Sequence, residues 1–228
     1  MRIEHLARLL EARLAALVPG ARLCPLHPPE LPELSLWLLD PATAEAGVAP
    51  QWVAQLMDAP PFWCLCWGAG QALARHLLDH PDAVAGRTVI DLGSGCGVAG
   101  IAAALAGAAR VVLCDRDPLA LAAGRLNARW NGVRVECAPS LDDALARLAS
   151  GERTRTLGLA ADFRYDPASA PLLLRLAQAT GTVWCADAAI AGSTPPQGQP
   201  LGRAWLPPFP GAETSPAFAD VALWRLTT

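Results

Sequence analysis

Two patterns of apolar residues, one typical of strands and one typical of helices, alternate along this chain, and their alternation predicts its architecture. Between residues 87 and 187, short continuous apolar runs of strand length are separated by segments with helical periodicity. Such alternation is typical of a parallel, doubly wound α/β sheet with right-handed crossovers. The predicted strands are 87–92, 109–114, 133–137, 156–161 and 181–187, and the predicted helices between them are 97–106, 118–130, 141–149 and 167–179.

The N-terminal part of the chain departs from this alternation. Residues 2–18 place leucines on one side of a predicted helix, which Pro19 and Gly20 end. Residues 25–62 are rich in proline and hold one short strand-like run, 34–39. We therefore expect residues 1–62 to form an N-terminal helix and cap, followed by a domain of residues 63–228.

The segments that flank the alternating region predict three further features. Residues 67–80 read as a helix that ends before Pro81. Residues 192–216 carry many glycines and prolines and do not read as a regular crossover helix. Residues 217–226 read as a final strand.

The most informative motif is a glycine turn between the first predicted strand of the sheet and its helix. Gly93, Gly95 and Gly97 stand at every second position after a buried strand that contains Asp91. Glycines in such a turn bring bare backbone close to a ligand. Because helix N-termini hold anions, a carboxylate at the strand end instead favours a cationic or hydroxyl-rich ligand. The adenosyl sulfonium and amino group of S-adenosylmethionine fit that description.

A second acidic residue, Asp115, follows the next predicted strand, twenty residues beyond Gly95. A carboxylate at this place is suited to bind the hydroxyls of a ribose, as in dinucleotide-binding folds. This feature predicts adenosine ribose without identifying the cofactor.

A competing interpretation rests on the same glycines. Gly95, Gly97 and Gly100 match the dinucleotide fingerprint G-x-G-x-x-G, which would indicate a nicotinamide or flavin site. That fingerprint opens directly after its strand, whereas here it begins two residues late, behind Gly93. A glycine-rich turn without any ligand is the third alternative.

Composition narrows the function classes. The chain has 228 residues, 53% of them hydrophobic and 17% charged, with a net charge of −3. This balance is typical of a globular domain and argues against a nucleic-acid partner held through phosphates. No apolar run is long enough for a membrane span, and the N-terminus does not read as a signal peptide. All eighteen basic residues are arginines, and the absence of lysine is typical of a GC-rich bacterial genome.

The seven cysteines predict a reducing compartment and no metal site. Their number is odd, no C-x-x-C occurs, and most lie in apolar runs, as reduced core thiols of a cytoplasmic protein do. His76 and His80 stand four residues apart, but the end of a helix before Pro81 explains them better than a metal pair.

Four blocks of sequence, 62–73, 80–97, 114–118 and 161–166, together resemble one family. They look like the seven-β-strand, S-adenosylmethionine-dependent methyltransferases that modify protein lysines. The resemblance is strongest to the electron-transfer flavoprotein β-subunit lysine methyltransferases and their bacterial relatives, and it covers roughly residues 30–187. It implies a Rossmann-like seven-stranded sheet with an antiparallel closing strand.

The resemblance also implies roles for individual residues. Those that would bind the cofactor are Trp67, Gly70, Gln71, Asp91, Gly93, Gly95, Gly97 and Asp115. Asp162, at the end of the fourth predicted strand of the sheet, would face the acceptor amine, with Tyr165 near the entrance. The implied partner is a protein substrate such as the electron-transfer flavoprotein β-subunit.

Two departures from the family pattern leave the acceptor open. Arg164 stands where the family has an aromatic residue, and residues 186–190 replace a Gly-Asp-Pro-Gly-Arg-like block. A small-molecule N- or O-methyltransferase on the same fold is therefore the first alternative function. A nicotinamide- or flavin-dependent oxidoreductase and a non-catalytic binding module are the others.

Overall fold

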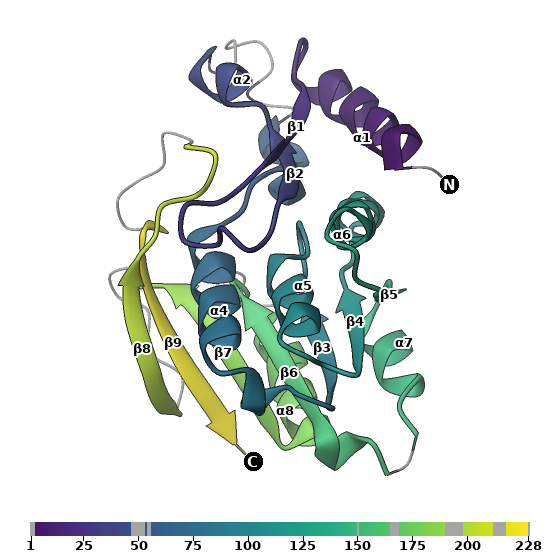
Figure 1. The fold of residues 1–228 in the computed structure, drawn as a ribbon, viewed down its shortest axis with the longest axis vertical. Coiled ribbons are helices and arrows are strands. Elements are labelled where there is room, and N and C mark those ends of the chain that lie inside the picture. Colours follow the sequence, from purple (N-terminus) through teal and green to yellow (C-terminus); the bar gives the residue numbers. More distant parts are fainter. Residues whose placement is uncertain are drawn as a thin grey trace.

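The computed structural model describes residues 3–46, 53, 56–149, 151–164, 169–189, 198–211 and 218–227 (Figure 1). The longer helices are α1 (Ile3–Leu17), α2 (Pro41–Ala46), α4 (Gly68–Asp79), α5 (Val98–Leu105), α6 (Pro118–Trp130), α7 (Leu141–Ala146) and α8 (Ala170–Thr180). Short 3-10 turns span Phe62–Cys64, Pro81–Ala83 and Arg153–Arg155. The strands are β1 (Leu23–Leu26), β2 (Leu36–Leu39), β3 (Thr88–Leu92), β4 (Arg110–Cys114), β5 (Glu136–Ala138), β6 (Thr156–Ala161), β7 (Thr182–Ala188), β8 (Gln199–Trp205) and β9 (Asp220–Thr227).

Among the described residues, seven strands form one sheet in the order β5-β4-β3-β6-β7-β9-β8. Strands β3 to β7 pair in parallel, whereas β9 runs antiparallel to both of its neighbours. The winding reverses at β3, which lies between β4 and β6. Open α/β sheets bind ligands outside the carboxyl ends of their strands at such a point. The predicted doubly wound α/β fold with an antiparallel closing strand is confirmed.

Helices cover both faces of the sheet, because successive strand residues point to opposite faces. Val89 packs with residues of α4 and α5 in one cluster, while Ile90 packs with residues of α7 and α8 in the other. Helix α6 lies beyond α5 over β4 and β5 (Figure 1). All five residues of β3 are buried, as a central strand covered on both faces requires.

The structure corrects several predicted boundaries. Strand β5 begins at Glu136 rather than at residue 133, because residues 133–135 follow the turn at Gly132 without pairing with β4. Helix α7 ends at Ala146 rather than 149. The predicted start of α8 at Pro167 lies outside the described residues, and the helix is described from Ala170.

Strands β1 and β8 were not predicted from the sequence. Strand β8 forms the sheet edge within the glycine- and proline-rich stretch and is mostly exposed, so no apolar alternation reveals it. Strand β1 is only four residues long and contains Pro25. It pairs with β2 as an antiparallel ribbon separate from the main sheet.

The N-terminal elements lie at the end of the molecule to which the parallel strands point, next to α6 (Figure 1). Leu6, Leu10 and Leu14 of α1 pack in one apolar cluster with Ala123 and Leu126 of α6. The leucine face that the sequence predicts for the first helix therefore packs against α6.

Two asparagines, Asn127 in α6 and Asn131 directly after it, bind the N-terminal ribbon. The Asn127 side chain is fully buried, accepts a hydrogen bond from the Trp37 amide at 2.7 Å and donates to the Cys96 carbonyl at 2.9 Å. One turn later, Asn131 accepts from the Ser35 amide at 2.9 Å and donates to the Ser35 carbonyl at 2.6 Å. They are the only two asparagines in the chain.

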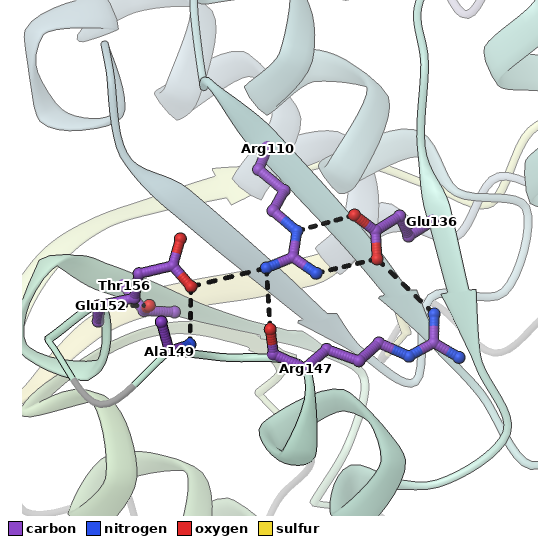
Figure 2. A network of polar contacts seen from close by, with 6 residues as sticks. All are labelled: Arg110, Glu136, Arg147, Ala149, Glu152 and Thr156. Carbon is purple, nitrogen blue, oxygen red and sulfur yellow. Dashed lines mark hydrogen bonds and ion pairs between the residues drawn. The ribbon is translucent and has the colours of Figure 1, made fainter.

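At the opposite, amino end of the sheet, charged side chains form a connected network (Figure 2). Arg110 donates through two nitrogens to the two carboxylate oxygens of Glu136, at 2.7 and 2.9 Å, and to the Arg147 carbonyl at 3.0 Å. Glu152 lies 3.6 Å from Arg110 and accepts from the Ala149 amide. Paired arginine–carboxylate geometry of this kind is the strong form of a surface ion pair. The network joins β4, β5 and the segment before β6.

We expect Asn127→Ala to lower the free energy of unfolding by about 2–3 kcal/mol, because it leaves the Trp37 amide and the Cys96 carbonyl without their partner. Arg125→Ala, on the exposed side of α6, is the matched control, with an expected effect within about 0.5 kcal/mol. Urea unfolding of both variants measures the difference. Equal effects would show that the Asn127 bonds do not hold the ribbon.

Candidate functional site

The three glycines of the turn after β3 adopt positive φ angles, and each meets different surroundings. A Cβ at Gly97 would lie 2.9 Å from the Gly124 Cα of α6, and a Cβ at Gly93 would lie 2.8 Å from the Phe163 ring. A Cβ at Gly95 would meet nothing within 4 Å, although the φ there is +51°. Gly97 and Gly93 therefore serve close packing, and Gly95 is the glycine of the turn that faces open space.

Asp91 lies near the end of β3, where its carboxylate stabilises the start of α5. The N-cap residue of α5 is Gly97, which has no side chain to cap the helix, and the Asp91 Oδ2 accepts the Gly100 amide at 2.9 Å. The side chain is buried, and this burial raises the pKa of Asp91 to about 7. Asp91 thus holds the first turn of α5, and its role in the cofactor site stays a prediction.

Asp115 directly follows β4 and bridges two turns. Its Oδ2 accepts the Gly95 amide and its Oδ1 accepts the Asp117 amide, both at 2.9 Å. Burial raises the pKa of this carboxyl. Because a carboxylate oxygen can accept two hydrogen bonds and each oxygen of Asp115 accepts one, Asp115 keeps acceptor capacity beside the open Gly95.

Asp162 directly follows β6 and has a left-handed backbone, with φ +48°. This conformation is uncommon for a residue other than glycine, although aspartate and asparagine tolerate it. The carboxylate accepts the Ala69 amide in the first turn of α4 and lies 3.4 Å from the Ala188 amide. Burial, and then the nearby Asp187 carboxylate, raise its pKa to about 7.

Asp187, near the end of β7, is a buried carboxylate that the sequence did not single out. Its Oδ1 accepts the amides of Phe163 and Arg164, each at 3.0 Å. Its Oδ2 is buried without a hydrogen-bond partner among the described residues and lies 4.0 Å from the Arg164 guanidinium. Burial raises the pKa of Asp187 to about 6. The signal available in the sequence was an acidic residue at the end of a fifth buried strand.

The aromatic-glycine-glutamine block lies at the start of α4. Trp67 is half-buried, donates from Nε1 to the Phe62 carbonyl at 2.9 Å and meets the Phe62 ring edge-on. Gly70 is required for packing, because a Cβ there would lie 2.9 Å from a methyl group of Val98 in α5. Gln71 is buried and donates from Nε2 to the carbonyls of Cys66 and Pro207.

These contacts join the start of α4 to the segment that follows β8. Cys66 and Phe209 exchange backbone hydrogen bonds of 2.7 and 2.9 Å. A Cβ at Gly68 would lie 2.0 Å from the Leu206 carbonyl oxygen, so this helix start accepts only glycine. Trp67, Gly70 and Gln71 thus shape the border of the site, and their contact with a cofactor stays a prediction. Tyr165 lies outside the described residues.

Four carboxylates therefore line the carboxyl ends of four neighbouring parallel strands: Asp91 and Asp187, which are buried, and Asp115 and Asp162, which are partly buried. Among the described residues, the Arg164 guanidinium lies within ion-pair distance of one of them, Asp187. Such a concentration of acidic groups favours a cation and disfavours the pyrophosphate of a dinucleotide. Within the described ranges, no three potential metal ligands lie close enough together to hold an ion.

Comparisons with known proteins agree with this geometry. A family model described as ribosomal protein L11 methyltransferase (PrmA) matches residues 72–150. The electron transfer flavoprotein beta subunit lysine methyltransferase of Rattus norvegicus is 51% identical over 73 residues, which are 32% of this chain and 29% of that protein. A homolog of that methyltransferase from Caenorhabditis elegans is 31% identical over 155 residues, covering 62% of this chain and 61% of that protein. The resemblance to these methyltransferases is confirmed, although the chain spans less than two thirds of either relative.

Solved structures confirm the fold. A candidate S-adenosylmethionine-dependent methyltransferase from Streptococcus mutans aligns with 92% of this chain and 56% of its own, with a TM-score of 0.55 and 14% identity. A candidate RNA methyltransferase from Pyrococcus horikoshii aligns with 70% of this chain and 83% of its own, with a TM-score of 0.50 and 17% identity. None of the helices in the described part of the chain has the length and apolar character needed to cross a bilayer.

We expect Asp91→Asn to stabilise the fold at neutral pH, because asparagine still accepts the Gly100 amide without a buried charge. Between about pH 4 and pH 7 the folded state holds the Asp91 proton more tightly than the unfolded state, so wild-type stability falls as pH rises. The advantage of the variant grows through this window to roughly 1–4 kcal/mol at pH 8. Unfolding at pH 4 and pH 8, with the exposed Asp82→Asn as control, measures it. A pH-independent difference would contradict a raised pKa.

Proposed function

We propose that this chain binds S-adenosylmethionine and transfers its methyl group to a nitrogen acceptor, a protein lysine. The observation that carries the proposal is the row of four buried or partly buried carboxylates at the carboxyl ends of β4, β3, β6 and β7, which suits a cationic cofactor and a cationic acceptor. The matches to named methyltransferases support it. The dinucleotide alternative is disfavoured because these carboxylates would repel a pyrophosphate.

The residues present fit this cofactor. The open backbone at Gly95 leaves room for a ligand, and the Asp115 carboxylate beside it suits the hydroxyls of a ribose. When bound, S-adenosylmethionine supplies an electrophilic methyl group on a sulfonium sulfur. The protein's part is then to align the acceptor nitrogen with that methyl group and to exclude competing arrangements.

Asp162 is the residue that we assign to the acceptor. A lysine ammonium has no lone pair, so it must lose a proton before it accepts a methyl group. A carboxylate hydrogen-bonded to the amine orients the nitrogen and stabilises the cationic product. Because the pKa of Asp162 is raised to about 7, its carboxylate also receives a proton more readily than an ordinary aspartate does. The bonds from Ala69 and Ala188 show that it has a structural role as well.

We propose a protein as the acceptor, since the methyltransferases named above are described by protein substrates: the electron transfer flavoprotein beta subunit and ribosomal protein L11. The chain itself contains no lysine, so a label that appears on lysine must be on the partner. Tyr165 would lie near the entrance for the acceptor. A small molecule methylated on nitrogen or oxygen is the alternative that the test must separate.

We further propose that residues 1–62 act as a cap on the domain of residues 63–228, since α1 and the β1–β2 ribbon pack on α6. A reducing compartment such as the cytoplasm suits the seven cysteines, which are all free and mostly buried.

The deciding experiment incubates the purified protein with S-adenosylmethionine labelled in its methyl group. Purified electron-transfer flavoprotein, a bacterial protein fraction and a small-molecule fraction serve as acceptors. Label on lysine of the flavoprotein or of another protein supports the proposal. Label only in small molecules would keep the cofactor and replace the acceptor class, and no label in any sample would contradict the transferase function.

We expect Asp115→Ala to weaken S-adenosylmethionine binding about 10- to 100-fold, through loss of hydrogen bonds to a charged acceptor. Isothermal titration calorimetry measures the affinity, and thermal unfolding checks that the Gly95 turn still forms. Asp82→Ala, at an exposed position, is the control and should bind like the wild type. Unchanged affinity in Asp115→Ala would remove Asp115 from the cofactor site.

We expect Asp162→Asn to lower kcat about 100-fold while the affinity for S-adenosylmethionine changes less than about threefold. Asparagine tolerates the left-handed backbone and still accepts the neighbouring amides, so this variant removes the charge with little strain. Steady-state methyl transfer at saturating cofactor is the measurement. Full turnover in the variant would leave Asp162 with its helix-capping role alone.

A further inference from the structure

Asp187 makes an unusual pair of contacts for a residue near the end of a strand. A single oxygen of its side chain accepts two successive backbone amides, those of Phe163 and Arg164, both at 3.0 Å. These amides lie on the loop directly after Asp162, more than twenty residues away in the sequence. The carboxylate is 92% buried, so the hydrogen bonds form away from competing water.

The neighbouring residues of β7 complete this attachment. The Asp162 amide donates to the Ala186 carbonyl at 2.9 Å, and the Ala188 amide lies 3.4 Å from Asp162 Oδ1. Three consecutive residues of β7 thus contact residues 162–164. The left-handed backbone of Asp162 is held between them.

The same loop reaches the glycine turn. The Phe163 ring lies so close to Gly93 that a Cβ there would be 2.8 Å from it. The loop of residues 162–164 therefore contacts the cofactor side of the site through Phe163 and carries the acceptor-facing carboxylate on Asp162. A shift of this loop would move the Phe163 ring away from Gly93 and would change the direction of the Asp162 carboxylate.

We propose that Asp187 is a positioning residue for methyl transfer, which fixes the loop of Asp162 and Phe163 by accepting the amides of Phe163 and Arg164. The inference rests on the proposed function, because it concerns the same site. Asp187 acts through hydrogen bonds to the backbone, not through its charge. The 4.0 Å ion pair with Arg164 balances that charge beside the loop.

Two substitutions separate hydrogen bonding from charge. Asp187→Asn keeps an oxygen that accepts both amides, whereas Asp187→Ala removes the acceptor. We expect Asp187→Ala to lower kcat about 10- to 100-fold, with the KM for the protein acceptor within about threefold, because misplaced reacting groups reduce turnover. We expect Asp187→Asn to recover most of kcat, to within about fivefold of the wild type. Asp82→Ala is the exposed control.

Amide hydrogen exchange gives a readout that does not depend on activity. Asp187→Ala should speed exchange at Phe163 and Arg164, while Asp187→Asn should keep their protection. Thermal unfolding checks that both variants fold, and the asparagine variant carries the test if the alanine variant does not.

The outcomes distinguish failure of the Asp187 positioning role from failure of the proposed methyltransferase function. If the wild type is active and Asp187→Ala turns over equally fast, or if Asp187→Asn loses as much activity as Asp187→Ala, positioning by these hydrogen bonds is wrong. If the wild type transfers no methyl group to any acceptor, the proposed function fails, and the positioning role fails with it. Loss in the alanine variant with rescue by asparagine supports both.

Discussion

The hydrogen bond from the Gly100 amide to the buried Asp91 carboxylate joins β3 to the first turn of α5, and the glycine turn depends on it. A helix whose N-cap residue is glycine has no side chain to satisfy its first amides, so the strand must supply an acceptor. Gly100 has to be a glycine for this, because a Cβ there would lie 2.4 Å from Leu113 and 3.0 Å from Asp91 itself. The bond from Gly100 thus offsets part of the free-energy cost of burying the Asp91 carboxylate, and it requires a glycine at position 100.

The other carboxylates of the site share this arrangement. Asp162 accepts an amide at the start of α4, whose N-cap residue Trp67 makes no side-chain cap, and Asp115 accepts the Gly95 amide. Asp187 accepts two amides of a loop. Each carboxylate thus accepts backbone amides at the carboxyl end of its strand. A single substitution at any of them therefore alters local structure and electrostatics together, which is why charge-removing isosteres are more informative than alanine.

The sequence predicted the central sheet well because its strands are buried on both faces and read as continuous apolar runs. It also predicted the glycine turn, with Asp91 and Asp115, because these residues act within one βαβ unit and their spacing is local. It did not predict β8, whose side chains are mostly exposed, or the role of Asp187, whose partners lie on another strand's loop. Contacts between distant segments, such as Gln71 with Pro207, leave no local pattern to find.

Asn131, directly after α6, has a further chemical consequence. Asn131 precedes Gly132, and an asparagine before glycine is prone to deamidation, in which the glycine nitrogen attacks the side-chain amide carbon. Here the Asn131 side chain is held by Ser35 and the Asn127 carbonyl, and the Gly132 amide donates to Arg129. Folding thus restrains both partners of that reaction. Deamidation at Asn131 therefore requires this helix end to open, and it would remove the side-chain donor to the Ser35 carbonyl.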